Sequence, residues 1–263
     1  MQDLRITSIQ APLVWEDPAA NLHYFAGQLR GLRGETDLIV LPEMFTTGFT
    51  MNAGPLAETM DGPSVRWMTE RARELNAAIT GSLIILDRRR YYNRLVFAYP
   101  DGEVVSYDKR YLFTPAGEDA AYHRGRRRTV IPYRGWCIRP LICYDLRFPV
   151  WSRQLLDDPY DVLVYVASWP AARAEDWRTL LRARAVENQC YVVGVNRIGK
   201  DGNGYVYSGD SCVIDPGPRR ELYGADSREE AVTVTLSAKE LHALRQRLPF
   251  LRDADYFAVD SPR

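Results

Sequence analysis

The sequence predicts an α/β protein in which mixed β-sheets carry helices on their outer faces. The apolar pattern changes repeatedly between short continuous runs, which are typical of buried strands, and the 3.6-residue period of amphipathic helices. The predicted order strand-helix-strand-helix-strand-strand also occurs twice, and a further strand follows each copy. These two observations indicate a duplicated unit, although no residue-level repeat accompanies it.

The first half of the chain carries the first copy of this pattern. One helix is predicted after Asp17-Pro18, which offers an N-cap and a proline at the first helical position, and another near Asp61-Gly62-Pro63. The turn sequence Pro100-Asp101-Gly102 joins the last two strands in a hairpin. The predicted strands of this half are Leu4–Ile9, Asp37–Leu41, Ile79–Leu86, Asn93–Tyr99 and Glu103–Tyr107.

The second half carries the second copy. A helical stretch is predicted after Pro149, a longer helix over Ala174–Asn188 and a closing helix over Ala238–Leu248. Apolar residues line one side of the longer helix, and the segment Trp177–Asn188 offers positions for self-association. The predicted strands of this half are Cys137–Cys143, Asp161–Ala167, Cys190–Asn196, Tyr205–Ile214 and Glu230–Leu236.

Composition excludes several classes of protein. The 34 Lys and Arg residues balance 34 Asp and Glu residues, so no overall positive field attracts nucleic acid or an anionic membrane.

We expect a single domain over residues 1–263, because no linker sequence divides the chain. The chain shows neither a signal-peptide pattern nor a run of about 20 apolar residues. The 4 cysteines form no CxxC pair, which favours a cytoplasmic location and gives a poor metal site.

Three polar residues stand where predicted strands end. Glu43 follows an apolar run, Lys109 follows the hairpin, and Cys143 follows Ile138–Ile142. Ligands of α/β sheets bind beyond the carboxyl ends of strands, so a carboxylate, an ammonium and a thiol meeting there would form a catalytic set. Taken singly, each residue also has an ordinary structural interpretation: a helix-capping glutamate, a surface lysine and a core cysteine.

The segments around these residues resemble the nitrilase (carbon–nitrogen hydrolase) superfamily. The resemblance covers nearly the whole chain and is weakest over roughly the last 45 residues, a candidate interface tail. Within the superfamily the chain is most similar to the Nit-type ω-amidases, through Glu43–Phe49 and Cys143–Pro149. The matching segments, in order, are Leu41–Glu43, Tyr107–Phe113, Leu141–Pro149, Ala167–Pro170, Arg182–Asn188 and Val195–Gly199.

This resemblance implies a four-layer α-β-β-α sandwich with an embedded Glu-Lys-Cys site and neither cofactor nor metal. It implies an amidase that hydrolyses the terminal amide of small ω-amides, such as 2-oxoglutaramate or 2-oxosuccinamate, to ammonia and a carboxylate. Members of the superfamily usually pair through helices, so a homodimer or a larger homo-oligomer is expected. No nucleic acid or membrane is expected as a partner.

The chemistry explains why these residue types are needed. An amide is a poor electrophile, so a thiolate such as that of Cys143 is a suitable nucleophile if another group takes its proton. Glu43 serves as that base if burial raises its pKa toward neutrality. The Lys109 ammonium and the backbone N–H of Tyr144 then stabilise the oxyanion. A Cys-His site is unsupported, because none of the 3 histidines lies near Cys143 in sequence.

The resemblance also suggests a second glutamate between the lysine and cysteine segments. Glu118 is the matching residue, where it would hold Lys109 and position the amide, although the adjacent Asp119 is the alternative. A substrate carboxylate calls for an arginine. Arg147 is the candidate, but it is equally suited to anchoring Asp145 or a backbone carbonyl. Three aromatic residues are predicted either to wall the substrate pocket or to pack in the core: Phe45, Tyr144 and Trp169.

Two alternatives to an ω-amidase remain open at this stage. A nitrilase or an N-carbamoyl-amine hydrolase would use the same three residues. A catalytically silent member would instead act as a binding or scaffold protein, although the presence of Glu43, Lys109 and Cys143 argues against it.

Overall fold

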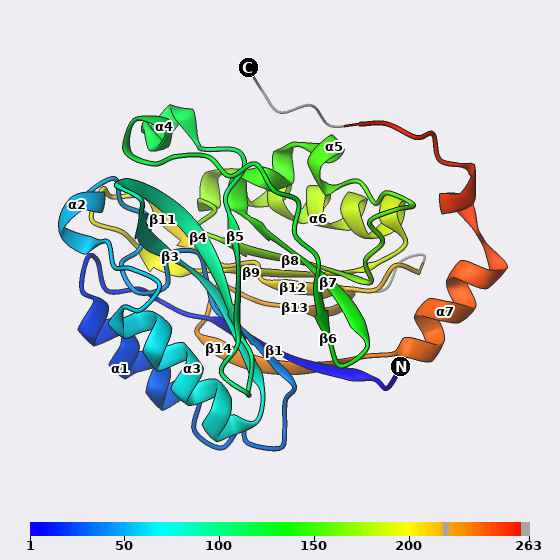
Figure 1. The fold of residues 1–263 in the computed structure, drawn as a ribbon, viewed down its shortest axis with the longest axis horizontal. Helices are drawn as coiled ribbons and strands as arrows, with labels where there is room; N and C mark the ends of the chain where they lie inside the picture. Colours follow the sequence, from blue (N-terminus) through cyan, green and yellow to red (C-terminus); the bar gives the residue numbers. More distant parts are fainter. Residues whose placement is uncertain (218–220, 259–263) are drawn as a thin grey trace.

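Two six-stranded sheets pack face to face in the middle of the molecule, and helices cover the outer face of each (Figure 1). The computed structural model describes residues 1–217 and 221–258. Helices α1 (Pro18–Gln28) and α3 (Pro63–Leu75) lie outside the first sheet, whereas α5 (Pro149–Ser152) and α6 (Ala174–Asn188) lie outside the second. This arrangement is the predicted four-layer sandwich.

The first sheet has the strand order β14-β1-β2-β3-β4-β5. The neighbours β1, β2 and β3 are parallel, β14 and β4 pair antiparallel with β1 and β3, and β5 pairs antiparallel with β4. Asp17 accepts a hydrogen bond from the Ala20 N–H, as an N-cap of α1 should, and so fixes the connection from β1 to β2. The strands are β1 (Leu4–Gln10), β2 (Leu38–Val40), β3 (Ala78–Asp87), β4 (Arg90–Ala98), β5 (Val104–Asp108) and β14 (Glu230–Leu236).

The second sheet repeats the plan with the order β13-β12-β9-β8-β7-β6. Here β7, β8 and β9 are parallel, and β6, β12 and β13 are antiparallel to their neighbours. The duplicated order of elements therefore corresponds to two sheets of similar topology, and β14 returns to the first. The strands are β6 (Ile131–Tyr133), β7 (Trp136–Ile142), β8 (Val162–Ala167), β9 (Tyr191–Asn196), β12 (Cys212–Ile214) and β13 (Glu221–Gly224).

Apolar packing explains why the layers stack in this order. The largest cluster fills the space between the sheets and continues to α6, whose Trp177, Leu181 and Ala185 are fully buried. A second cluster joins the outer face of the first sheet to α1 and α3 through Phe25 and Met68. These buried positions of α6 serve the core rather than self-association, and Val186 is the large apolar residue of that segment that is exposed.

Two predicted strands need correction. The strand Tyr205–Ile214 is interrupted, because Gly209 and Asp210 both have positive φ and turn the chain between β11 (Val206–Ser208) and β12. The strand Cys137–Cys143 ends one residue early, because Cys143 also has positive φ. Sequence patterns did not predict the shortest elements: β6, β10 (Ile198–Lys200), β13, α2 (Ala53–Leu56) and α4 (Glu118–Ala121).

The last helix, α7 (Ala238–Arg247), agrees with its prediction to within one residue. Ser237 caps it, and Asp3 accepts a hydrogen bond from the Ala238 N–H, which ties the helix to the first strand. Short 3-10 turns complete the described chain at Thr114–Ala116, Cys143–Arg147, Ala171–Arg173 and Phe250–Asp253. Within residues 1–217 and 221–258, no helix has the length and apolarity needed to cross a membrane.

Candidate active site

The three polar residues predicted from strand ends meet between the two sheets. Glu43 follows β2 and Lys109 follows β5, both in the first sheet, whereas Cys143 follows β7 of the second. The side chains of Glu43 and Lys109 are completely buried. Cys143 is half-buried and close enough for both charges to influence its pKa. Face-to-face packing of the sheets thus assembles a site from residues 100 positions apart in the chain.

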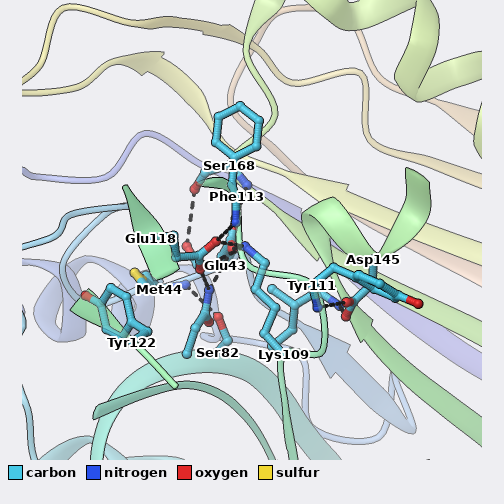
Figure 2. Close-up of polar contacts among 12 residues, drawn as sticks. Glu43, Met44, Ser82, Lys109, Tyr111, Phe113, Glu118, Tyr122, Asp145 and Ser168 are labelled. Carbon is cyan, nitrogen blue, oxygen red and sulfur yellow. Dashed lines mark hydrogen bonds and ion pairs between the residues drawn. The ribbon is translucent and has the colours of Figure 1, made fainter. Parts of the chain in front are cut away.

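A lysine ammonium bridges two buried carboxylates at the centre of this site (Figure 2). Lys109 Nζ donates to Glu43 Oε1 at 2.8 Å, and to Glu118 Oε1 and Oε2 at 2.9 and 2.8 Å. Glu118 also accepts a hydrogen bond from the Phe113 N–H at 2.5 Å. Asp119 is exposed, so the geometry selects Glu118 rather than its neighbour as the fourth member of the cluster.

Three residues of the cluster were not predicted as site residues. Asn93 of β4 donates from Nδ2 to both Glu43 Oε1 and Glu118 Oε1, at 2.8 and 3.1 Å. The Ser168 N–H donates to Glu43 Oε2 at 2.8 Å, and the Phe49 ring lies 5.0 Å from Lys109 Nζ. Ser168 was visible as part of a matching segment, and Asn93 as a polar residue in an apolar strand. Phe49 also ends a matching segment, Glu43–Phe49, but nothing in the sequence marked its ring as a contact of Lys109.

The backbone is strained on both sides of the site. Cys143 has φ +41° and Met44, directly after Glu43, has φ +45°, which is uncommon for residues other than glycine. Such conformations cost about 1–3 kcal/mol each and persist where the surroundings hold them. The Met44 N–H is held by Ser82 Oγ at 2.9 Å. The sharp turn at Cys143 places its side chain beyond the strand end.

Asp145 braces the turn that carries the cysteine. Its buried carboxylate accepts hydrogen bonds from the N–H groups of Ile142 and Tyr111, at 3.0 and 2.9 Å, and from the Tyr107 hydroxyl at 2.8 Å. The bond from Ile142 fixes the residue before Cys143. The bond from Tyr111 fixes the segment after Lys109 and is drawn in Figure 2. Burial raises the Asp145 pKa to about 6, although these hydrogen bonds oppose the shift.

Burial is the largest influence on the ionisable groups of the site. Burial raises the pKa of the Cys143 thiol well above its ordinary value, Glu43 raises it further, and Lys109 opposes both. Burial alone would lower the Lys109 pKa, but the carboxylates of Glu118 and Glu43 raise it above its ordinary value. At neutral pH the resting site therefore contains a thiol and an ammonium, so the sulfur must lose its proton as it attacks.

The predicted substrate-binding residues fall into different environments. Tyr144 is half-buried, and its ring packs edge-to-face on Phe113 with centroids 5.0 Å apart. Trp169 is 4% exposed and donates from Nε1 to the Arg173 carbonyl at 2.8 Å. Tyr144 therefore borders the site, whereas the indole of Trp169 is mostly packed.

Phe45 requires a correction. It is completely buried in the cluster between the first sheet and its helices, 5.5 Å from the Phe25 ring and 6.1 Å from the Trp67 ring. Packing, rather than a place in the substrate pocket, therefore accounts for this side chain. It points to the opposite face of the sheet from Glu43, two residues earlier, because Met44 redirects the backbone between them.

Arg147 was predicted to bind a substrate carboxylate or to anchor Asp145 or a backbone carbonyl, but its partner in the structure is Asp176. Its Nη2 donates to Asp176 Oδ2 at 2.6 Å, and its guanidinium lies 4.9 Å from the Trp169 ring. Asp145 is held by other groups, as described above. Arg147 thus links the turn after Cys143 to the first turn of α6.

The three histidines of the chain lie at its surface. His23, His123 and His242 are all exposed, and no histidine contributes to the pKa shift of Cys143. Among the described residues, no group of three or more His, Cys, Asp and Glu side chains could hold a metal ion.

We expect Cys143 to be the only cysteine whose alkylation inactivates the protein. Cys143 and Cys137 are half-buried, whereas Cys190 and Cys212 are buried, so the first two compete for the reagent. Because the pKa of Cys143 is raised, its labelling by iodoacetamide should accelerate as the pH rises past the ordinary thiol range. Mass mapping checks the assignment, with Cys137→Ser as the control that should still be inactivated. Full activity after complete labelling of Cys143 would contradict it.

Comparisons with known proteins agree with this geometry. The model of the family described as carbon-nitrogen hydrolase matches residues 5–246. The chain is 48% identical over 261 residues to the omega-amidase YafV of Escherichia coli K12, covering 98% of this chain and 100% of the relative. It is 30% identical to the 2-oxoglutaramate amidase of Bacillus subtilis, covering 94% and 96%.

A solved structure is also similar. The CN-hydrolase superfamily protein XC1258 of Xanthomonas campestris superposes with a TM-score of 0.96 at 45% identity, covering 99% of this chain and 100% of that one. That structure carries an arsenic adduct in its active site.

Proposed function

Because this chain belongs to the carbon–nitrogen hydrolase family, we propose that it hydrolyses the terminal amide of small ω-amides through a thioester on Cys143. The chain is a hydrolase of carbon–nitrogen bonds other than peptide bonds, of the ω-amidase type. Substrates such as 2-oxoglutaramate and 2-oxosuccinamate fit this class. The observation that carries the proposed mechanism is the Lys109 ammonium bridging two buried carboxylates beside a thiol. A single domain over residues 1–263 is consistent with the extent of the family match.

The first half of the reaction forms the thioester. Glu43 takes the proton from Cys143 as Sγ bonds to the amide carbon, and the carbonyl electrons move onto oxygen. Lys109 Nζ and the Tyr144 N–H stabilise this oxyanion, since fixed donors in a buried site act strongly on developing charge. Glu43 then returns the proton to nitrogen, the C–N bond breaks, and ammonia leaves.

The second half releases the acid. Glu43 takes a proton from a water molecule as the water oxygen attacks the thioester carbon. The same donors stabilise the second oxyanion, the C–S bond breaks, and the Cys143 sulfur regains a proton from Glu43. The products are the dicarboxylate and the resting thiol. Glu118 holds Lys109 in place and assists in positioning the amide, because both of its oxygens accept from Nζ.

A substrate panel tests the reaction class. Ammonia release is measured with succinamate and 2-oxoglutaramate, with a nitrile of the same length, and with an N-carbamoyl amine. We expect the two ω-amides to give the highest kcat/KM. A preference for the nitrile or the carbamoyl compound would place the chain in another branch of the family, and no turnover of any compound would favour a silent binding protein.

We also propose a cytoplasmic homo-oligomer. The 4 cysteines of the chain are free in the structure, as expected of a reducing compartment. Zero net charge does not oppose association, and Val186 and Val150 are exposed apolar residues on α6 and α5. Light scattering at micromolar concentration should give a mass at least twice the 30.1 kDa of one chain. A mass equal to that of one chain would exclude the oligomer.

A further inference from the structure

An ω-amide substrate brings a second charged group to the site, and the cluster at Lys109 has no positive charge left for it. The ammonium already contacts both carboxylates, at 2.8 Å each. A distal carboxylate would therefore meet Glu43 and Glu118 without compensation unless another cation lies near. Arginine is the side chain that binds carboxylates with two parallel hydrogen bonds.

Two arginines near the strand ends are already used. Arg147 is paired with Asp176 at 2.6 Å. Arg197, directly after β9, is completely buried, and its side chain donates to backbone carbonyls of the chain itself. Its remaining nitrogen, Nη1, is buried beside Gly48 and so is not exposed to an incoming carboxylate.

Arg173 differs from both. It ends the 3-10 turn Ala171–Arg173, is half-buried, and has no ion pair within the described part of the chain. Its guanidinium lies 5.4 Å from the centre of the Phe113 ring. The Arg173 carbonyl accepts the hydrogen bond from Trp169 Nε1, which fixes the backbone from which the side chain extends.

Phe113 connects this arginine to the reacting groups. Its N–H donates to the Glu118 carboxylate that holds Lys109, and its ring contacts the ring of Tyr144, the residue after Cys143. Figure 2 shows the Phe113 ring pointing away from Glu118, toward the outside of the cluster. Arg173 is thus connected to the site through one aromatic ring, which contacts Tyr144 on one side and the guanidinium on the other.

We propose that Arg173 binds the distal carboxylate of the ω-amide and so determines the preference for anionic amides; this inference rests on the proposed function. Arg173 is a specificity-determining residue in this account. The Phe113 ring lies within cation–π distance of the guanidinium, whose N–H groups have no ion-pair partner within residues 1–217 and 221–258.

The test compares succinamate with butyramide, which has the same chain length but a methyl group in place of the carboxylate. Arg173→Gln should lower kcat/KM for succinamate about 10²-fold, mainly through KM, because a hydrogen-bonded charge contact is lost. The same variant should hydrolyse butyramide within about threefold of wild type. Arg178→Gln, which removes an exposed arginine of α6, is the matched control and should leave kcat/KM unchanged for both substrates.

The outcomes separate this inference from the proposed function. An equal loss for both substrates in Arg173→Gln would show a structural role and overturn the inference. If Arg147→Gln lost kcat/KM for succinamate but not for butyramide, and Arg173→Gln lost neither, the distal carboxylate would be assigned to Arg147 instead. If wild-type protein itself does not turn over succinamate, the proposed function fails, and the inference fails with it.

Discussion

Replacing Glu43 with glutamine is expected to lower kcat by about 10²–10⁴, the usual cost of losing a general base. The loss should lie toward the upper end, because Glu43 serves both thioester formation and thioester hydrolysis. Glutamine retains an oxygen that accepts from Lys109 and Asn93, so the cluster keeps most of its contacts. Single-turnover measurements of ammonia release and of acid release should both be slowed.

A matched control exists for this substitution. Glu58→Gln replaces a half-buried carboxylate that, like the completely buried Glu43, accepts a backbone N–H, but this N–H is that of Ser64 at the start of α3. The kcat of Glu58→Gln should lie within about twofold of the wild-type value, since glutamine keeps an acceptor oxygen for the Ser64 N–H. Turnover of Glu43→Gln near the wild-type rate would show that another group takes the proton of Cys143.

Replacing Lys109 with methionine is expected to slow acylation by about 10²–10³, because the oxyanion loses a charged donor. The variant also leaves Glu43 and Glu118 facing each other in a buried space without their counter-charge. Loss of one partner from a buried ion pair commonly costs about 3–5 kcal/mol of folding stability, so the melting temperature should fall as well. Rates are therefore measured on protein shown to be folded at the assay temperature.

The two variants should differ in what they accumulate. Glu43→Gln hydrolyses its thioester slowly, so a fraction of the protein should carry the acyl group, whereas Lys109→Met should carry none. Lys239→Met removes an exposed lysine of α7 and serves as the control for the loss of a lysine elsewhere. Equal acylation of Lys109→Met and wild type would contradict the assigned role of the ammonium.

Local sequence patterns predicted most of the sandwich because its long elements are strongly apolar and well capped. The bounds of α6 and β14 agree fully with prediction, and α1 begins at the predicted proline. The apolar pattern did not predict the short strands β6, β10 and β13, because three or four residues are too few to show the two-residue period of a strand. The break between β11 and β12 depends on the φ of Gly209 and Asp210, which no apolar pattern records.

The site was predictable where a residue follows a long buried strand, as Glu43 and Cys143 do. Asn93 was not, because it lies within β4 and reaches both carboxylates only after the two segments fold together. For Phe45 the structure supports core packing and not the pocket: it stands two residues from Glu43, yet the positive φ of Met44 sends it to the other face of the sheet. Side-chain direction at such a bend depends on backbone conformation, not on sequence distance.

The central claim is that the amide carbon is transferred to Cys143. Glu43→Gln is mixed with succinamate, quenched in acid, and examined by intact-mass and peptide-mass measurement beside Cys143→Ala. The account predicts an adduct with the mass of the substrate less ammonia, on the peptide that contains Cys143, and no adduct and no turnover in Cys143→Ala. Turnover by Cys143→Ala, or an adduct on any other residue, would contradict it.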